Sequence, residues 1–298
     1  MVAQVSHASH IEFTRNAKRT IRETMPEIIS KFPRRSTNAS TVAFYLYGKD
    51  LSTRQRGPRG RDGQGNIPAV VNQKERTSAT MVQATWRDTV AVEDEFKSAI
   101  SERSQMMMEM GADIGNQMTD YLFDQLDERH LHNVDWSDAD ITGSNSKSPT
   151  YAIRKTLDSM QKYDSGIGLF GLVRPEVVNF WKANDENFIS VDYRNTKVLG
   201  EGTASRMFPY WGVNWMMTSL LPGSGFSNDS DDAKMFIFAP QCCDWVDGII
   251  STDSGITKDG HQQYYLSTIK EFCFRVVDPR GVAAIDYHTS VVESAESS

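Results

Sequence analysis

A glycine-rich string is the first feature of this sequence with a possible chemical role. Gly166, Gly168 and Gly171 give the pattern G-x-G-x-x-G, which in dinucleotide-binding folds joins a strand to the helix whose amino terminus holds a pyrophosphate. Here a helical pattern precedes the string, and an apolar, strand-like run passes through it and beyond. No βαβ unit with an acidic ribose contact follows. We therefore expect a turn and a strand whose small residues permit close packing, and no nucleotide cofactor.

A second group of residues has the chemistry of metal ligands. His130 and His132, with Asp135 and Asp138, would place two imidazoles on one face of a strand, where they could share an ion. A surface linker after a long helix explains them better, because histidines are common near helix ends. The three carboxylates at 93–95 are equally well explained by the amino terminus of a helix. We expect no metal site.

Nucleophilic catalysis has little support in the residue pattern. The chain lacks a G-x-S-x-G string, and the adjacent Cys242 and Cys243 have no flanking basic group that would lower a thiol pKa. With Cys273 they give neither a disulfide framework nor a zinc-ligand spacing, which fits a reducing cytoplasm. The sequence therefore predicts a protein that is not an enzyme, with no catalytic residue.

Composition places the chain among ordinary globular proteins. Its 298 residues, 39% hydrophobic and 24% charged, suffice for one large core or two smaller ones. No apolar run approaches the ~20 residues of a membrane helix, and the amino terminus lacks an apolar signal region. We expect a soluble protein without a membrane partner.

Charge is distributed unevenly along the chain. A net charge of −7 argues against general affinity for nucleic acid, but basic residues concentrate near the amino terminus and in the stretch 54–76. An acidic body with basic arms suits self-association, because an arm can lie on a neighbour's acidic surface. The candidate inter-subunit contacts are Arg15, Arg19, Arg22, Arg54, Arg56, Arg59 and Arg61.

These arginines lie on two segments of the chain, each of which we expect to form an arm. Residues 9–32 have helical spacing that Pro26 interrupts. Two strand-like segments, 42–47 and 80–92, flank a stretch rich in Gly, Arg and Pro that cannot bury enough apolar surface to form a core. This pattern predicts a long two-stranded arm with a flexible tip.

A long amphipathic helix is expected from Asp94 to about Glu128. Its apolar residues fall on one stripe, and some thirty residues at ~1.5 Å each would give a rod of ~40 Å. The stripe comprises Met107, Met110, Ile114, Met118, Tyr121, Leu122 and Leu126.

The remainder predicts a second α/β region. After a polar linker (130–147), we expect a helix over 150–163, a strand over 168–173 and a helix with Pro175 in its first turn. Residues 208–223 have the pattern of a strand ending in a turn. Segments 233–240 and 264–287 have the pattern of antiparallel strands, with a turn at 278–281.

This order of elements resembles the major capsid proteins of tailed bacteriophages, whose α+β architecture is called the Hong Kong 97 fold, and is most similar to the short-tailed phage family. Three stretches carry the resemblance: 86–126, 148–195 and 207–222. In that family the first continues as the spine helix of the peripheral domain. The second supplies a helix, strand and helix of the axial domain, and the third an inner strand of its sheet.

The resemblance implies a division of the chain into five parts. These are an N-terminal arm (1–36), an extended β-hairpin loop or E-loop (37–85), a peripheral domain with the spine helix (86–147), an axial domain (148–250), and returning strands with a C-terminal tail (251–298).

It also implies a function and partners. Family members form hexamers and pentamers of an icosahedral head that encloses double-stranded DNA without sequence-specific binding. Assembly uses a scaffolding protein, a portal and in some members a decoration protein. The expected location is the virion, after assembly in the host cytoplasm.

Three alternatives stay open. An encapsulin-type compartment shell would have the same fold but enclose a protein cargo. A soluble nucleotide-dependent enzyme rests only on the glycine string. A phage tail or decoration protein would form tubes, rings or small oligomers.

Overall fold

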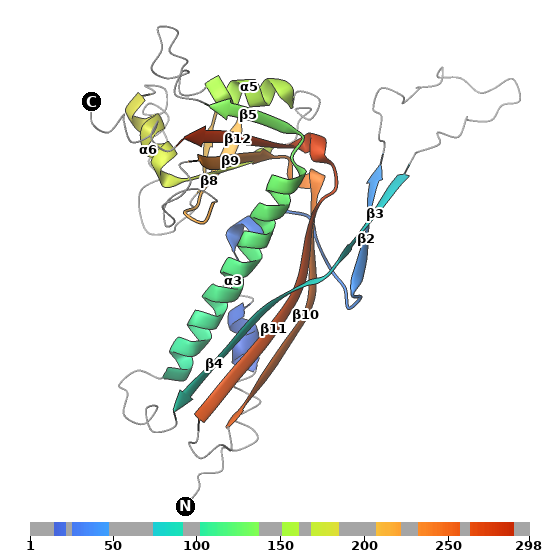
Figure 1. The fold of residues 1–298 in the computed structure, drawn as a ribbon, viewed down its shortest axis with the longest axis vertical. Helices are drawn as coiled ribbons and strands as arrows, with labels where there is room; N and C mark the ends of the chain where they lie inside the picture. Colours follow the sequence, from blue (N-terminus) through green and yellow to red (C-terminus); the bar gives the residue numbers. More distant parts are fainter. Residues whose placement is uncertain are drawn as a thin grey trace, which may run out of the picture.

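The computed structural model describes residues 15–21, 26–47, 74–91, 102–136, 151–160, 168–184, 207–221, 232–256 and 263–288. This part of the chain forms two α/β bodies and a two-stranded arm that projects from them (Figure 1). Residues 15–21 are helical. The other elements are η1 (Glu27–Lys31), β1 (Arg34–Ser36), β2 (Thr41–Tyr47), β3 (Lys74–Thr80), β4 (Val82–Ala91), α3 (Glu102–Arg129), β5 (His132–Trp136), α5 (Tyr151–Ser159), β6 (Leu169–Val173), α6 (Pro175–Asn184), β7 (Met207–Tyr210), β8 (Val213–Met217), β9 (Asp232–Phe238), η3 (Pro240–Cys242), β10 (Cys243–Ile256), β11 (Gln263–Val276), η4 (Pro279–Gly281) and β12 (Val282–His288).

The first body packs α3 along one face of a four-stranded sheet with the order β1-β10-β11-β4. Successive strand residues point to opposite faces, and every second residue of β11 from Leu266 to Val276 is buried. Phe272 and Phe274 belong to the same apolar core as the buried stripe of α3. The helix therefore supplies one half of this core and the sheet the other.

The stripe predicted for the long helix is confirmed. Five of its members are at most 1% exposed: Met110, Ile114, Met118, Leu122 and Leu126. Met107 and Tyr121 are partly buried against the same core. The helix begins at Glu102 in the described part of the chain, and the predicted start at Asp94 lies outside it.

The second body is a mixed six-stranded sheet with the order β5-β12-β9-β6-β8-β7. One face carries a second apolar core shared with α5 and α6, in which Trp136, Trp181 and Trp215 are fully buried. Residues of the other face, including Phe236 and Phe238, enter the core behind α3. The two bodies therefore share one continuous apolar core.

The chain crosses between the two sheets through short 3-10 turns. η3 joins β9 to β10, and η4 joins β11 to β12. The turn expected at 278–281 is present, and Asp278 accepts hydrogen bonds from the backbone and side chain of Arg280. The expected antiparallel strands are also present, since β12 pairs with β9 and β11 pairs with β10 and β4. Strands β11 and β12 do not pair with each other across the turn, because they lie in different sheets.

Other expectations about local structure are also corrected. The polar linker contains strand β5, whose Val134 and Trp136 are buried. The single strand expected at 208–223 is the hairpin β7–β8, which turns at Trp211 and Gly212 with positive φ angles of 50° and 75°. Strand β10 was not predicted at all, because the aspartates along it obscure its alternation.

The strand after the arm also differs from the expectation. The predicted segment 80–92 corresponds to β4, which pairs with β11 in the body and not with β2. The strand that pairs with β2 is β3, which lies before this segment, in the stretch predicted to carry the flexible tip. The predicted two-stranded arm is present, but its second strand ends at Thr80.

Candidate inter-subunit interface

The arm is the most prominent feature available for contact with another molecule. Strands β2 and β3 pair in antiparallel register from Thr41↔Thr80 to Tyr47↔Lys74 and lead away from the body (Figure 1). At the base, Val42 and Phe44 pack on Val246 and Cys273, on the face of the four-stranded sheet opposite α3. The four tip arginines, Arg54, Arg56, Arg59 and Arg61, lie outside the described residues.

The amino-terminal segment is partly docked on its own subunit. In the helical stretch 15–21, Ala17 and Ile21 are buried in the core behind α3. Arg15 and Arg19 are exposed on the same stretch, and Arg22 lies outside the described residues. The structure therefore separates a buried apolar side from an exposed basic side, and it brings none of the predicted arginines into a common site within the described ranges.

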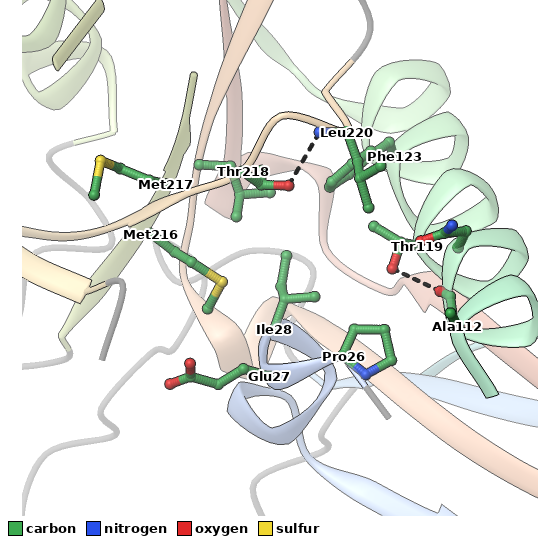
Figure 2. A pocket seen from close by; sticks show the side chains of 13 residues that line it. Pro26, Glu27, Ile28, Ala112, Thr119, Phe123, Met216, Met217, Thr218 and Leu220 are labelled. Atoms are coloured by element: carbon green, nitrogen blue, oxygen red, sulfur yellow. Dashed lines mark hydrogen bonds between the residues drawn. The ribbon is translucent and has the colours of Figure 1, made fainter. Parts of the chain in front are cut away.

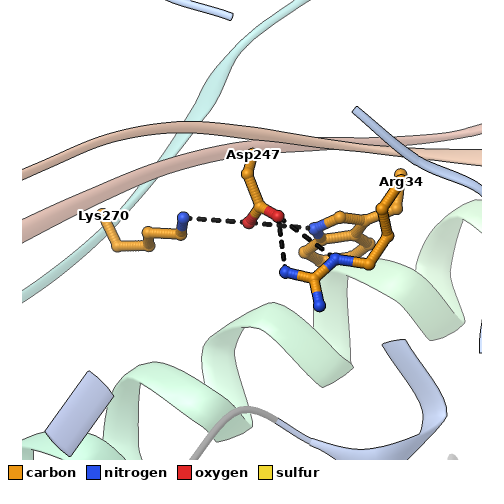
Figure 3. Close-up of polar contacts among 4 residues, drawn as sticks. Arg34, Asp247 and Lys270 are labelled. Atoms are coloured by element: carbon orange, nitrogen blue, oxygen red, sulfur yellow. Dashed lines mark hydrogen bonds and ion pairs between the residues drawn. The ribbon is translucent and has the colours of Figure 1, made fainter. Parts of the chain in front are cut away.

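A polar cluster holds the next part of this segment to the body. Figure 3 shows Asp247 accepting hydrogen bonds from Arg34 at 2.6 Å, from Lys270 at 2.9 Å and from the Trp245 indole at 3.3 Å. The Lys270 side chain is only 4% exposed. Burial disfavours the charge on Asp247, but Arg34 and Lys270 outweigh burial and hold its pKa below the ordinary value. Asp247 therefore remains a carboxylate that ties β1 to β10 and β11.

Sequence reasoning missed this cluster, although one signal was available. Lys270 occupies an inward position in the alternating pattern of β11. A lysine at such a position requires a buried carboxylate partner. The identity of that partner depends on the register of β10, which the sequence did not reveal.

A cavity of about 310 Å³ lies where η1, α3 and the six-stranded sheet meet. Figure 2 shows Ile28, Phe123 and Met216 on its walls, and Thr119 donates its hydroxyl hydrogen to the backbone oxygen of Gly115. Glu27 is the only titratable side chain among the described lining residues. The described lining residues include no nucleophile paired with a base, which is the arrangement expected of a catalytic site.

The other residues singled out for chemistry do not form a site. Gly171 lies inside β6, where a Cβ atom would come within 2.4 Å of the Trp215 ring, so this glycine permits close packing as predicted. Gly168 has only an ordinary contact, and Gly166 lies outside the described residues. Burial raises the pKa of the Cys242 thiol to about 12 and raises those of Cys243 and Cys273, so these thiols are poor nucleophiles.

The remaining candidates were the metal ligands and the carboxylates. Across the described ranges, His, Cys, Asp and Glu side chains do not gather into a group of three that could hold a metal ion. Asp138 and the carboxylates at 93–95 lie outside those ranges. Among the described helices, none is both long and apolar enough to cross a bilayer.

Comparisons with known proteins bear on the whole architecture. Neither a protein-family model nor a curated protein sequence matches the chain. Solved structures do match. The capsid of Ralstonia phage GP4 superposes with a TM-score of 0.63 at 12% identity, over 87% of each chain. The capsid of cyanophage P-SCSP1u gives 0.59 at 11% identity, over 86% of each.

A compartment shell is also similar. The SrpI encapsulin of Synechococcus elongatus gives a TM-score of 0.55 at 10% identity, over 90% of each chain. These structures are shells rather than enzymes. The chain therefore has the mixed α+β fold of phage capsid proteins, as the resemblance in its sequence predicted.

Proposed function

We propose that this chain is the major capsid protein of a tailed bacteriophage, which assembles into hexamers and pentamers of an icosahedral head around double-stranded DNA. The observation that carries the proposal is the superposition on the GP4 capsid, which spans 87% of both chains and so includes both α/β bodies.

The parts of the chain have proposed roles in the shell. The segment 1–36 is the N-terminal arm, 37–85 the E-loop with β2 and β3 as its stem, and 86–147 the peripheral domain with α3 as spine helix. The segment 148–250 is the axial domain, and 251–298 the returning strands and tail. Two strands do not follow these boundaries: β5 lies within 86–147 but belongs to the six-stranded sheet, and β10 begins within 148–250 but belongs to the four-stranded sheet beside α3. We therefore propose that β10 and β11 go with the peripheral domain, and β5 and β12 with the axial domain.

The physical basis is that the described strands of the arm, beyond the contacts at their base, leave surface that another molecule can cover. A two-stranded ribbon is marginally stable by itself, and the arm buries few residues against its own subunit. A basic tip with Arg54, Arg56, Arg59 and Arg61 would find its counterpart on the acidic body of an adjacent copy. Overlap of this kind is typical of homo-oligomers with large interfaces.

The proposed partners follow from this role. They are further copies of the chain, a scaffolding protein, a portal and in some heads a decoration protein, with packaged DNA held without sequence-specific contacts. The proposed location is the virion, after assembly in the host cytoplasm. The net charge of −7 would limit adhesion of the shell to the DNA during packaging.

The second candidate is an encapsulin-type compartment, favoured by the 90% coverage of the SrpI encapsulin. Negative-stain microscopy of the chain expressed alone and with its scaffolding protein distinguishes the two. A phage capsid protein should give uniform closed heads only with the scaffold. Closed particles from the chain alone that enclose a protein cargo would favour the compartment, and a stable monomer would contradict both.

A further inference from the structure

The junction between the arm and the body contains one side chain that links its own strand, β1, to two others, β10 and β2. Strand β1 has all three of its side chains exposed, so burial of apolar surface does not hold it in place. Its first two residues point to opposite faces of the sheet. Arg34 reaches Asp247 on the α3 side, and Arg35 reaches Asp244 on the arm side at 3.0 Å.

Arg35 also contacts the first strand of the arm. Its guanidinium donates a hydrogen bond to the backbone oxygen of Ala43 at 3.0 Å. The same group lies over the Phe44 ring, with 4.7 Å from the guanidinium carbon to the ring centre. A planar guanidinium can donate hydrogen bonds along its edges and stack on a ring through its face, which a lysine ammonium cannot do.

The remaining contacts between the arm and this face of the body are few. The buried part is a small cluster of Val42, Phe44, Val246 and Cys273, with Ala79, Met81 and Val277 packed at its margin. Beyond this cluster, β2 and β3 pair only with each other within the described residues.

We propose that Arg35 is the positioning residue that fixes the direction of the β2–β3 arm relative to the body. Its link to Asp244 anchors it to β10, and its contacts with Ala43 and Phe44 hold β2 against that anchor. In a shell this would present every arm to its neighbour at one angle. That last step rests on the proposed capsid function, whereas the positioning of the arm does not.

Arg34 provides a matched control for this proposal. It is the same residue type on the same strand, it pairs with an aspartate of the same β10, and it is exposed to the same degree, 41% for each side chain. It lies on the α3 side, away from Ala43 and Phe44. Loss of Arg34 should therefore weaken β1 without releasing the arm.

The direct test is a distance measurement by pulsed electron spin resonance. Spin labels are placed on exposed positions of the arm and the body with Ser78→Cys and Ser251→Cys, in full-length chain diluted into unlabelled chain. The native cysteines are buried, which limits their labelling. Unmodified chain and Arg34→Ala should give one narrow distance distribution, and Arg35→Ala should lose that single peak.

Two further variants test the stacking and folding. Arg35→Lys keeps the charge but not the planar group, so it should also lose the narrow peak. Phe44→Leu keeps an apolar side chain and removes the ring face, so it should broaden the distribution even if Arg35→Ala fails to fold. A narrow peak in either Arg35→Lys or Phe44→Leu, or equal broadening by Arg34→Ala, would overturn the proposal.

A shell-assembly assay distinguishes failure of this inference from failure of the proposed capsid function. With unmodified chain forming heads, Arg35→Ala should give shells of mixed diameter or open sheets, and Arg34→Ala should give heads of the usual diameter. Uniform heads from Arg35→Ala would refute the role in assembly. If the unmodified chain forms no heads, the capsid function fails, while the distance measurement still decides whether Arg35 positions the arm.

Discussion

The core behind α3 and the base of the β2–β3 arm show how unequally this molecule is stabilised. The core joins α3, both sheets and the amino-terminal segment through one continuous set of buried side chains. The arm base rests on a cluster centred on four buried residues, together with the polar contacts of Arg35. The difference indicates that many more buried apolar side chains hold the body together than hold the arm to it.

Removal of one aromatic ring from the core behind α3, and of one from the arm base, should show most clearly how differently the two regions contribute to the free energy of unfolding. Phe274→Ala deletes a fully buried ring that packs 4.9 Å from Phe32, and it should lower the free energy of unfolding by about 3–5 kcal/mol. Phe44→Ala removes an equally buried ring at the arm base. Because the arm can detach without the body unfolding, it should lower the same free energy by at most about 1 kcal/mol. Urea unfolding followed by circular dichroism measures both, and equal losses would contradict the contrast.

A smaller effect is expected inside the six-stranded sheet. Gly171→Ala would place a methyl group against the Trp215 ring, so it should destabilise the protein by about 1–3 kcal/mol. Gly168→Ala is the control, since the nearest atom to its Cβ would be 3.8 Å away, an ordinary contact. Thermal unfolding of the two variants should differ, and identical midpoints would show that the packing around Trp215 is looser than described.

The edge of the body sheet gives a third test. The Gln117 side-chain amide on α3 exchanges hydrogen bonds with the backbone of Thr85 on β4, at 3.1 and 3.0 Å. Gln117→Leu removes both bonds and should lower the free energy of unfolding by about 1 kcal/mol. It should also increase concentration-dependent association, because an uncovered strand edge is a site for pairing with another chain. An unchanged stability and association state would mean that the edge does not depend on this residue.

The smallest expected effect concerns acid. The pKa of Asp247 is lower in the folded chain than in an unfolded one, so its carboxylate stabilises the fold above the unfolded value, and that contribution is lost as pH falls through the folded value. Below about pH 4, unmodified chain should therefore lose stability more steeply than Asp247→Asn. Asp113→Asn, at an exposed position on α3, should keep the steep slope. Parallel slopes for all three proteins would contradict this role of Asp247.

Periodic segments could be predicted from the sequence, and elements defined by pairing could not. The α3 stripe from Met110 to Leu126 and the first turn of α6 at Pro175 follow from local spacing, and both are confirmed. Strand β10 was missed because Asp244, Asp247 and Asp253 interrupt its apolar pattern. The charges of Asp244 and Asp247 are compensated by residues far away in the chain, Arg35 for the first, and Arg34 and Lys270 for the second.

For the candidate interface too, the part encoded in local sequence could be predicted, and the part that depends on tertiary contacts could not. The existence of an arm followed from a Gly- and Arg-rich stretch between two strand-like segments, and β2 confirms its first strand. The second strand was misplaced, because it is β3 (Lys74–Thr80) and not 80–92. After Thr80 the chain leaves β3, which pairs with β2, and enters the body as β4, which pairs with β11. Only Met81, which belongs to neither strand, separates the two. Arg35 could not be singled out, because its three contacts depend on where β10 and β2 lie in space.

Head formation by a variant that lacks the basic charges between positions 54 and 61 tests whether the arm holds an adjacent copy of the chain. Arg54, Arg56, Arg59 and Arg61 are replaced together by alanine, and the variant is expressed with the scaffolding protein. Our account predicts an unchanged unfolding midpoint with few or no closed heads in negative-stain micrographs. Heads of normal number and diameter from this variant would contradict it.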